Sequence, residues 1–411
     1  MKIFFYLILV IPAFSNAQII QNFTNYTVND GLIDNSVNCI SIDGNNNIWI
    51  GTQNGISKFD GTTWTSYTNA MDSGIVNNTI NTICALSNGN IWIGTDFGAS
   101  LYDGSTWTPY TTLNGLGDDR INHIAEKSDG SIWFSDYDGI TIYDGSTWTS
   151  YTMNDGLPFG GINQTDFDSN GDAWLASGLG GLIKFDGSTF ETYNQSNGLV
   201  NNKIRSILVD DQNNKWAGTA EGISEFNSGN ALTQNHTIML TLPPPDTLNP
   251  VEDLAIDSEG NIWAGIYVDY LVTEGGFAVF NGSFWVGFDV SDGLVGPVVR
   301  SIDIDDNDDV WVGTSTGISK IENTPVSLIE NEAIKFNIHP NPSNGFFQIE
   351  SSKQINHVTI KVKNIEGKQI ANINTNINHQ FNFEITGDSG MYFVEIISDG
   401  EKLFKTKIVK N

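Results

Sequence analysis

The chain has 411 residues, 39% of them hydrophobic, so it can bury a core and is not a wholly disordered protein. Its formal net charge is −29, and residues 18–334 carry the excess, with 9 basic and 41 acidic side chains. A domain this acidic repels nucleic acid and anionic membranes, so we expect neither as a partner. Residues 335–411 hold 9 basic and 7 acidic side chains, and this change predicts a second module.

The first seventeen residues have the pattern of a secretory signal peptide. Lys2 supplies a positive end, Ile3 to Ile11 is an unbroken apolar run, and small residues lead up to Ala17. Cleavage is expected before Gln18, and the apolar run is too short to span a bilayer. No later segment has eighteen consecutive apolar residues. We therefore expect an exported protein, secreted or held at the outer cell surface, and not an integral membrane protein.

A tryptophan recurs along the chain with spacings of 43, 41, 41, 42, 47 and 48 residues. The first six copies contain four short segments rich in β-branched and aromatic residues, of the types VNCISID, IWIGT, GISKF and TWTSYT, joined by turns such as Asp60-Gly61, and the seventh contains the first three. Four strands repeated seven times predict an all-β fold, a seven-bladed β-propeller over residues 18–325. The repeating tryptophans are Trp49, Trp92, Trp133, Trp174, Trp216, Trp263 and Trp311.

Each tryptophan lies in a segment such as Ile48-Trp49-Ile50 that is apolar on both faces. Both faces must be covered, as they are when a blade lies between two others, so the tryptophans are predicted to be wedges between blades. The seventh copy lacks its fourth strand. Residues 23–27, FTNYT, have the character of that strand, and we expect them to complete the last blade and close the ring.

Two cysteines, Cys39 and Cys84, fall in the same strand of neighbouring copies. Export permits a disulfide between them, although two buried, unpaired thiols are the favoured interpretation.

The repeated text DGL…IxxD…GNIWIGTxxGIxxFDG resembles the two-component regulator propeller repeat, over roughly residues 29 to 321. In that family the repeats often form the periplasmic sensor of hybrid histidine kinases that respond to polysaccharides. The resemblance therefore implies a ligand-binding propeller. No transmembrane helix or kinase follows the repeats, so sensing and phosphotransfer are not carried over to this chain.

The repeat stops after Pro325, and residues 326–334 are predicted to be a linker. Residues 335–411 contain period-2 segments such as VTIKVKNI and MYFVEII, which predict a small β-sandwich. This tail resembles the type A C-terminal sorting domain of the bacterial type IX secretion system. The resemblance implies the secretion machinery as a partner, passage across the outer membrane, removal of the tail, and release or surface attachment. A sugar-binding or adhesive sandwich is the alternative. The sorting-motif residues are Pro340, Asn341, Pro342, Gly345, Gly390, Tyr392, Lys407 and Lys410.

Catalytic and metal-binding signatures are weak. His123 is expected near the central channel, where a lyase could use it as general base beside Glu126 and Asp136, but a structural histidine is favoured. Acidic turns beginning at Asp168 and Asp305 offer the oxygen ligands that Ca²⁺ prefers. Because five of the seven copies have Asp at that position, turn capping is the favoured explanation and no cofactor is expected.

Departures from the repeat indicate where a ligand would bind. The connection between the second and third strands of copy six is seven residues longer than in copy one, and the link LPPPDTLNP before that copy is also irregular. Both are expected on one face over blades five and six, where aromatic and carboxylate side chains suit sugar rings. Neutral drift of these loops is the alternative. The candidate ligand residues are Asp96, Phe97, Asp136, Tyr137, Tyr267, Asp269, Tyr270 and Glu274.

These observations favour an exported, non-enzymatic binding protein whose propeller presents a face of loops to a glycan or a surface protein. One alternative is a polysaccharide or lactone lyase or hydrolase acting at the propeller face. Another is a stand-alone sensor-type propeller that acts with a membrane partner.

Overall fold

The computed structural model describes residues 22–240, 248–268, 274–322, 336–351, 355–365, 368–386, 388–398 and 401–411. One compact unit spans residues 21–324, and residues 325–411 belong to another. The predicted signal peptide and the predicted linker at 326–334 lie outside the described residues. Within the described part of the chain, no helix is long and apolar enough to cross a membrane.

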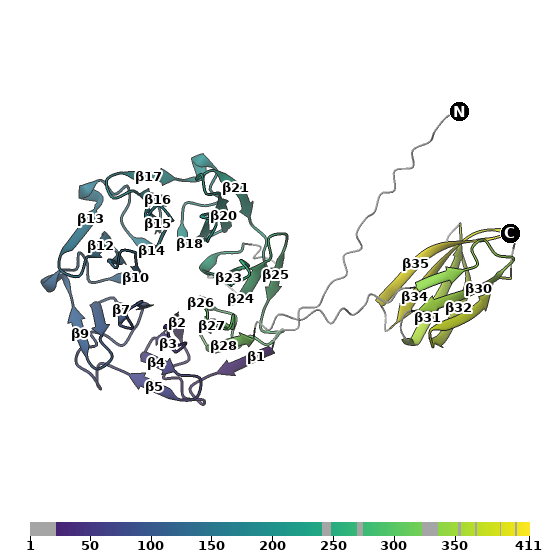
Figure 1. The fold of residues 1–411 in the computed structure, drawn as a ribbon, viewed down its shortest axis with the longest axis horizontal. Coiled ribbons are helices and arrows are strands. Elements are labelled where there is room, and N and C mark those ends of the chain that lie inside the picture. The colour runs from purple at the N-terminus through teal and green to yellow at the C-terminus, as the bar shows by residue number, and fades with distance from the viewer. Residues whose placement is uncertain are drawn as a thin grey trace. The chain divides into compact units, whose positions relative to one another are not determined.

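In the first unit, the described strands β1 to β28 form seven four-stranded antiparallel sheets, which lie as blades in a ring (Figure 1). Residues of the innermost strands line a central channel. The chain runs outward through each blade, and the innermost strand of each blade contacts the innermost strands of both neighbours, so the ring is closed. The innermost strands, from the first blade to the seventh, are β2 (Val37–Ile42), β6 (Thr82–Ala85), β10 (Ile121–Glu126), β14 (Ile162–Phe167), β18 (Ile204–Val209), β22 (Val251–Ile256) and β26 (Val299–Ile304).

The remaining strands follow the repeat in the same blade order. The second strands are β3 (Ile48–Thr52), β7 (Ile91–Thr95), β11 (Ile132–Asp136), β15 (Ala173–Ser177), β19 (Lys215–Thr219), β23 (Ile262–Val268) and β27 (Val310–Thr314). The third strands are β4 (Gly55–Phe59), β8 (Gly98–Tyr102), β12 (Gly139–Tyr143), β16 (Gly181–Phe185), β20 (Gly222–Phe226), β24 (Glu274–Phe280) and β28 (Gly317–Glu322). The outer strands are β5 (Trp64–Tyr67), β9 (Trp107–Tyr110), β13 (Trp148–Thr152), β17 (Phe190–Tyr193), β21 (Leu232–His236), β25 (Trp285–Phe288) and, in the seventh blade, β1 (Asn22–Tyr26).

The N-terminal strand closes the ring, as predicted. β1 pairs antiparallel with β28, with Phe23 opposite Ile321 and Tyr26 opposite Ile318. In Figure 1 the purple first strand lies beside green β28, so the two ends of the propeller meet in one sheet. This pairing covers an edge that would otherwise present unpaired backbone groups.

The repeating tryptophans lie between blades, as their pattern predicts. Trp174 of the fourth blade is fully buried and packs with Leu199, Ile204 and Ile207 of the next repeat. Trp311 of the seventh blade packs in the same way with residues of the first repeat, which joins the last blade to the first.

A second set of contacts ties the blades together around the channel mouth. In the first four blades an asparagine at or just before the start of the innermost strand donates to a backbone carbonyl of the next blade, at 2.7–3.1 Å. In the fifth blade Arg205 pairs with Glu252 of the sixth, and Arg300 of the seventh donates to Asn38 of the first at 3.0 Å. The asparagines are Asn38, Asn81, Asn122 and Asn163.

The second unit contains two antiparallel sheets that share one apolar core, including Phe347, Ile360 and Val394. One sheet has the order β29-β30-β33, and the other has the order β32-β31-β34-β35. This small β domain agrees with the period-2 pattern of the tail. Its strands are β29 (Phe336–His339), β30 (Phe346–Ser351), β31 (Ile355–Asn364), β32 (Gln369–Ile377), β33 (Gln380–Glu384), β34 (Gly390–Ser398) and β35 (Glu401–Lys410).

Candidate functional site

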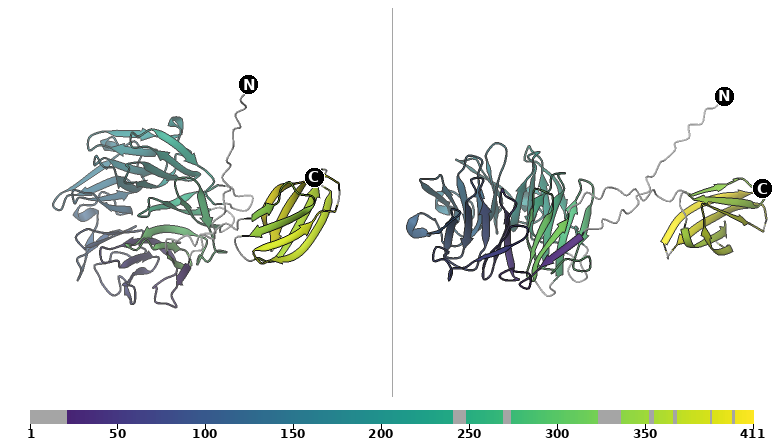
Figure 2. Two further views of the ribbon diagram at one scale, coloured as in Figure 1. Left: turned by 45° about the vertical axis from the view of Figure 1, so that its right-hand side comes forward. Right: turned by 60° about the horizontal axis from the view of Figure 1, so that its bottom comes forward.

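The strands of the propeller run between two faces with different connections (Figure 2). Because neighbouring strands are antiparallel, the turns between second and third strands and the connections between blades emerge on one face, named here the loop face. The turns between first and second and between third and fourth strands emerge on the other, the turn face. Three short 3₁₀ helices lie in the loop-face connections: η1 (Thr112–Asn114), η2 (Met153–Asp155) and η3 (Gln195–Asn197).

Exposed apolar side chains of the propeller gather on the loop face. Among the described residues, eleven of the twelve large hydrophobic side chains exposed on the propeller lie in loop-face segments, and Phe284 lies in a turn of the other face. The exposed apolar side chains of the described propeller residues are therefore unevenly divided between its two faces. The loop-face side chains are Val28, Met71, Phe97, Leu113, Tyr137, Met153, Phe159, Leu179, Ile238, Leu248 and Val290.

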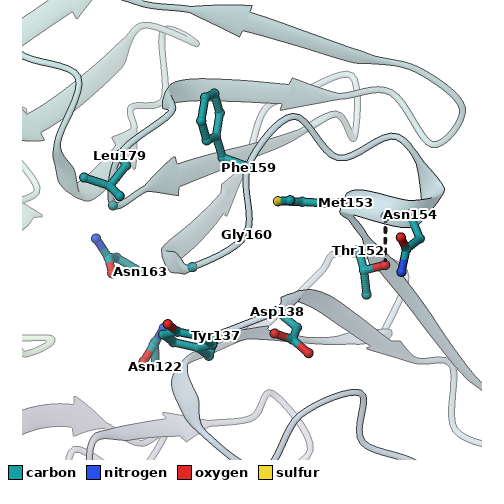
Figure 3. A pocket seen from close by; sticks show the side chains of 12 residues that line it. Asn122, Tyr137, Asp138, Thr152, Met153, Asn154, Phe159, Gly160, Asn163 and Leu179 are labelled. Carbon is teal, nitrogen blue, oxygen red and sulfur yellow. Dashed lines mark hydrogen bonds between the residues drawn. The ribbon is translucent and has the colours of Figure 1, made fainter.

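A pocket of about 700 Å³ opens on the loop face between the third and fourth blades (Figure 3). It is named here the junction pocket. Four apolar side chains surround it, Tyr137 (56% exposed), Met153 (63%), Phe159 (45%) and Leu179 (77%). Its polar lining residues are Asn122, Asp138, Thr152, Asn154 and Asn163, and its glycines are Gly160, Gly161 and Gly178. Asn122 and Asn163 also line the channel, so the pocket adjoins the channel mouth.

The connection that borders the junction pocket lacks a pair of polar caps that four of the other connections have. In four other connections a pair of Asn or Asp residues accepts backbone N–H groups of its own loop; Asn202, for example, accepts from Gln195 at 2.7 Å. Before the fourth blade this pair is replaced by Phe159 and Gly160, which carry no side-chain acceptor. The replacement removes two polar side chains and places an aromatic ring at the pocket. The capping pairs are Asp34-Asn35, Asn77-Asn78, Asp118-Asp119 and Asn201-Asn202.

Glycines allow the rim of the pocket to close. Gly161, with φ +70°, donates to the carbonyl of Tyr137 at 2.7 Å, and Gly178 donates to the carbonyl of Gly161 at 3.0 Å. The ring of Phe159 lies directly over Gly180, where a Cβ atom would come within 2.3 Å of it. The three loop segments are therefore tied to one another, and Phe159 has a fixed position.

Tyr137 is held from two sides. The guanidinium of Arg120 lies 3.6 Å from the centre of its ring, and Asp118 in turn pairs with Arg120 at 3.1 Å. Behind the turn, the carboxylate of Asp136 accepts from the backbone of Asp138 and Gly139 at 3.0 and 2.7 Å, and from a threonine hydroxyl. Burial raises the pKa of Asp136 to about 6.

The predicted ligand residues thus separate into groups. Tyr137 lines the junction pocket, and Phe97 is exposed on the loop face of the neighbouring second blade. Asp96 accepts from Asn81 at 2.8 Å on that same turn. Asp136 was expected in the loop, but it is the last residue of β11 and its buried carboxylate supports the turn instead of facing a ligand.

The insertion in the sixth blade has a different structure from the one expected. Tyr267 and Glu274 lie in strands β23 and β24, which extend beyond the usual length, with Tyr267 opposite Gly275. Asp269 and Tyr270 lie outside the described residues, so their role as ligand residues stays a prediction. The junction pocket forms at a different place, between the third and fourth blades.

Sequence reasoning missed Met153 and Leu179 as site residues, although both are more than 60% exposed. The available signal was the replacement of the Asn/Asp pair by Phe159-Gly160 and the run Gly178-Leu179-Gly180. Both departures keep the length of the repeat, so a search for insertions does not detect them.

The lyase residues do not form a catalytic group. His123 lines the channel, and its Nδ1 accepts the backbone N–H of Thr165 at 3.4 Å. Desolvation by burial lowers the pKa of His123 to about 4. Glu126 accepts from Ser87 at 2.6 and 2.8 Å, and Asp136 is used by its own turn. Each group has a structural partner of its own.

The acidic turns considered for calcium hold the tryptophan wedges. The carboxylate of Asp168 accepts from the indole nitrogen of Trp174 at 3.1 Å and from two backbone N–H groups of its turn. Asp305 does the same for Trp311 at 3.1 Å. Among the described residues no group of three or more His, Cys, Asp or Glu could hold a metal ion. Calcium binding stays untested by this geometry, but turn capping accounts for the carboxylates.

The two cysteines are unpaired, as favoured, and both line the channel. Cys39 is buried and Cys84 is partly buried, and desolvation raises the pKa of both thiols, that of Cys84 to about 12.

The three sorting motifs come together in the second unit. Asn341, between Pro340 and Pro342, accepts from Val409 at 2.8 Å and donates to the carbonyl of Lys407 at 3.0 Å. The ammonium of Lys410 donates to the carbonyl of Ile385 at 2.9 Å, and a Cβ atom at Gly345 would come within 3.1 Å of its side chain.

The third motif completes this group. Gly390 lies opposite Lys410 in the pairing of β34 with β35, and buried Tyr392 donates its hydroxyl to the carbonyl of Asp388 at 2.7 Å. The last strand is thereby fixed by both other motifs. Recognition of these residues by secretion machinery stays a prediction.

Comparisons with known proteins agree with this two-part organisation. The family model described as "Secretion system C-terminal sorting domain" matches residues 337–411. The family model described as "Two component regulator propeller" matches residues 31–54 and 74–97. No curated protein sequence matches the chain. The chain is thus a β-propeller followed by a secretion sorting tail, which implies export and contact with the secretion machinery.

Solved structures show the same fold at low sequence identity. The extracellular domain of a hybrid two-component system of B. thetaiotaomicron is 18% identical, with a TM-score of 0.66; the match covers 95% of this chain and 57% of that one. PorZ, a surface component of the type IX secretion system of Porphyromonas gingivalis, is 16% identical, with a TM-score of 0.56, over 93% of this chain and 60% of that one. A streptogramin B lyase is 14% identical, with a TM-score of 0.60, and the match covers 75% of this chain and 99% of the lyase. This chain therefore spans less than two thirds of the first of these proteins.

Proposed function

We propose that this protein is an exported binding protein whose propeller presents its loop face to a ligand at the cell surface or outside the cell. The ligand is a glycan or another surface protein. The observation that carries the proposal is the junction pocket, where exposed Tyr137, Met153, Phe159 and Leu179 surround a space large enough for a ligand.

Three further observations support a binding role. The exposed apolar side chains concentrate on the same face as the pocket. Arg120 and Asp136 hold Tyr137 in a fixed position, which lowers the entropy that binding would cost. The sorting tail supplies a route of export, and the first structural relative named above is itself an extracellular domain.

The experiment compares the mature full-length chain with two matched variants for retention of surface polysaccharides and purified envelope proteins. Tyr137→Ser combined with Leu179→Ser removes two pocket walls, and each lost apolar contact is worth about 1–2 kcal/mol. We expect retention to fall about tenfold or more. Phe284→Ser, a similar change on the turn face, is expected to leave retention unchanged. Equal retention by the pocket variant and the wild-type chain would contradict the proposal.

A further inference from the structure

The polar lining of the junction pocket offers more hydrogen-bond acceptors than donors. Asn122 and Asn163 each use one of their two Nδ2–H groups on a backbone carbonyl of the next blade, at 2.8 and 2.7 Å, which leaves one N–H and the Oδ1 of each for a ligand. The hydroxyl of Thr152 donates to Asp155 at 2.9 Å. A ligand that pairs with the oxygens of this lining, including the carboxylate of Asp138, brings N–H or O–H donors.

The local charge favours a cation. The twelve lining residues include the exposed carboxylate of Asp138 and no Lys, Arg or His. The neighbouring cation, Arg120, is paired with Asp118 and stacked on Tyr137. Arg120 also interacts electrostatically with Asp138. The carboxylates of Asp118 and Asp138 therefore share one guanidinium, and the net charge of these three groups at the rim is negative. The propeller as a whole carries the same sign, which attracts basic partners.

The apolar walls distinguish a peptide from a sugar. Sugar rings stack on aromatic faces and surround themselves with hydroxyls that need both donors and acceptors. Leu179 and Met153 offer aliphatic and thioether surface, which suits the apolar side chains of a peptide. Phe97 and Leu113 are also exposed on the loop face, in segments of the second blade and of its connection to the third.

We propose that the junction pocket binds an extended basic peptide segment of a partner protein. A lysine or arginine lies against Asp138 and the asparagine oxygens, and an adjacent apolar side chain lies against Leu179 and Phe159. This inference rests on the proposed function and specifies its ligand as a protein rather than a glycan.

The test is a selection of displayed random 12-residue peptides on the mature full-length chain, followed by fluorescence anisotropy of a selected peptide. We expect enrichment of Lys or Arg next to large apolar residues, and binding that weakens as salt rises. Asp138→Asn is expected to weaken binding on the order of tenfold, because the amide keeps a hydrogen-bond acceptor but loses the charge that attracts the cation of the ligand. Asp211→Asn, the same charge change at an exposed site on the turn face, is the control and is expected to have no effect.

Other outcomes separate this inference from the proposed function. Enrichment of uncharged or acidic peptides, or equal effects of Asp138→Asn and Asp211→Asn, would overturn the basic-peptide ligand. Binding on a glycan array that is lost with Tyr137→Ser, with no peptide enriched, would also overturn it while the proposed function stands. If neither peptides nor glycans bind, both proposals fail.

Discussion

Trp174 illustrates how single residues join the blades. Its ring is fully buried between the fourth and fifth repeats, and its indole nitrogen donates to Asp168 at 3.1 Å. Trp174→Ala removes this ring and leaves a cavity, so we expect the free energy of unfolding to fall by about 3–5 kcal/mol. Denaturant unfolding followed by fluorescence measures the change. Trp64→Ala, in a half-buried outer strand, is the control and is expected to cost less. An unchanged unfolding midpoint for Trp174→Ala would refute its role as a wedge.

Three carboxylates of the innermost strands, Asp166, Asp253 and Asp303, make the stability of the propeller depend on pH. Desolvation by burial raises the pKa of Asp303 to about 7 and the pKa values of Asp166 and Asp253 to about 6. The nearby charges of Asp253 and Asp305 raise the pKa of Asp303 further. A carboxyl whose pKa is raised on folding stabilises the fold below its unfolded value near 4, and this contribution is lost as pH rises through 6 to 7. Burial lowers the pKa of His123 to about 4, so the contribution of this side chain to stability increases as pH rises from 4 to 6.5.

Asp303→Asn tests this balance. The amide can still accept from the backbone of Ile42, which lies 3.0 Å from the carboxylate, but it cannot ionise. We compare the free energy of unfolding of the variant with that of the wild-type protein. We expect this difference to shift in favour of the variant by at least about 1 kcal/mol between pH 5 and pH 8, because one unit of pKa corresponds to about 1.4 kcal/mol. Thermal unfolding of both proteins across this range gives the difference. A difference that does not change with pH would show that Asp303 ionises normally.

At the scale of elements, the short strand β1 closes the ring of blades. Its pairing with β28 completes the seventh blade, and Tyr26 stacks on Trp311 with ring centres 5.9 Å apart. We expect removal of residues 18–28 to expose the edge of β28 and open the ring, so that the protein loses cooperative unfolding and self-associates. Calorimetry and light scattering measure both properties. Removal of residues 18–21 alone is the control, since it leaves β1 intact. A protein without residues 18–28 that still unfolds in one transition at the wild-type temperature would contradict the closure.

The elements themselves were predictable because each repeat carries its own strand and turn signals. The seven tryptophans, the turns and the closing strand at 23–27 all follow from local patterns, and the structure has them where expected. The junction pocket was not predictable in this way, because Phe159-Gly160 replaces a capping pair without changing the loop length. Reasoning from insertions favoured the sixth blade, where Tyr267 instead continues a strand. Asp136 was predicted to bind a ligand because it is a carboxylate in an expected loop. Its side chain is buried, and that burial depends on packing that the sequence does not reveal.

At the scale of the whole molecule, the propeller has two unlike faces. The turn face consists of Asx-capped turns such as those at Asp103 and Asp186, whose carboxylates accept the backbone N–H groups of the same turn. These hydrogen bonds lower the pKa of Asp103 to about 2 and use the acidic side chains locally. The loop face carries the apolar side chains and the junction pocket. The sorting tail implies that this propeller is exported, and its loop face is the one on which we propose that a ligand binds.

Hydrogen exchange of the mature full-length chain, with and without a ligand from the retention or peptide experiments, tests the central claim most directly. We expect slower exchange at residues 137–139, 152–161 and 178–180, which form the rim of the junction pocket. Exchange in the turn-face segments 60–63, 103–106 and 144–147 should stay unchanged. Slower exchange confined to those turn-face segments, with the pocket rim unaffected, would contradict the assignment of the loop face as the binding surface.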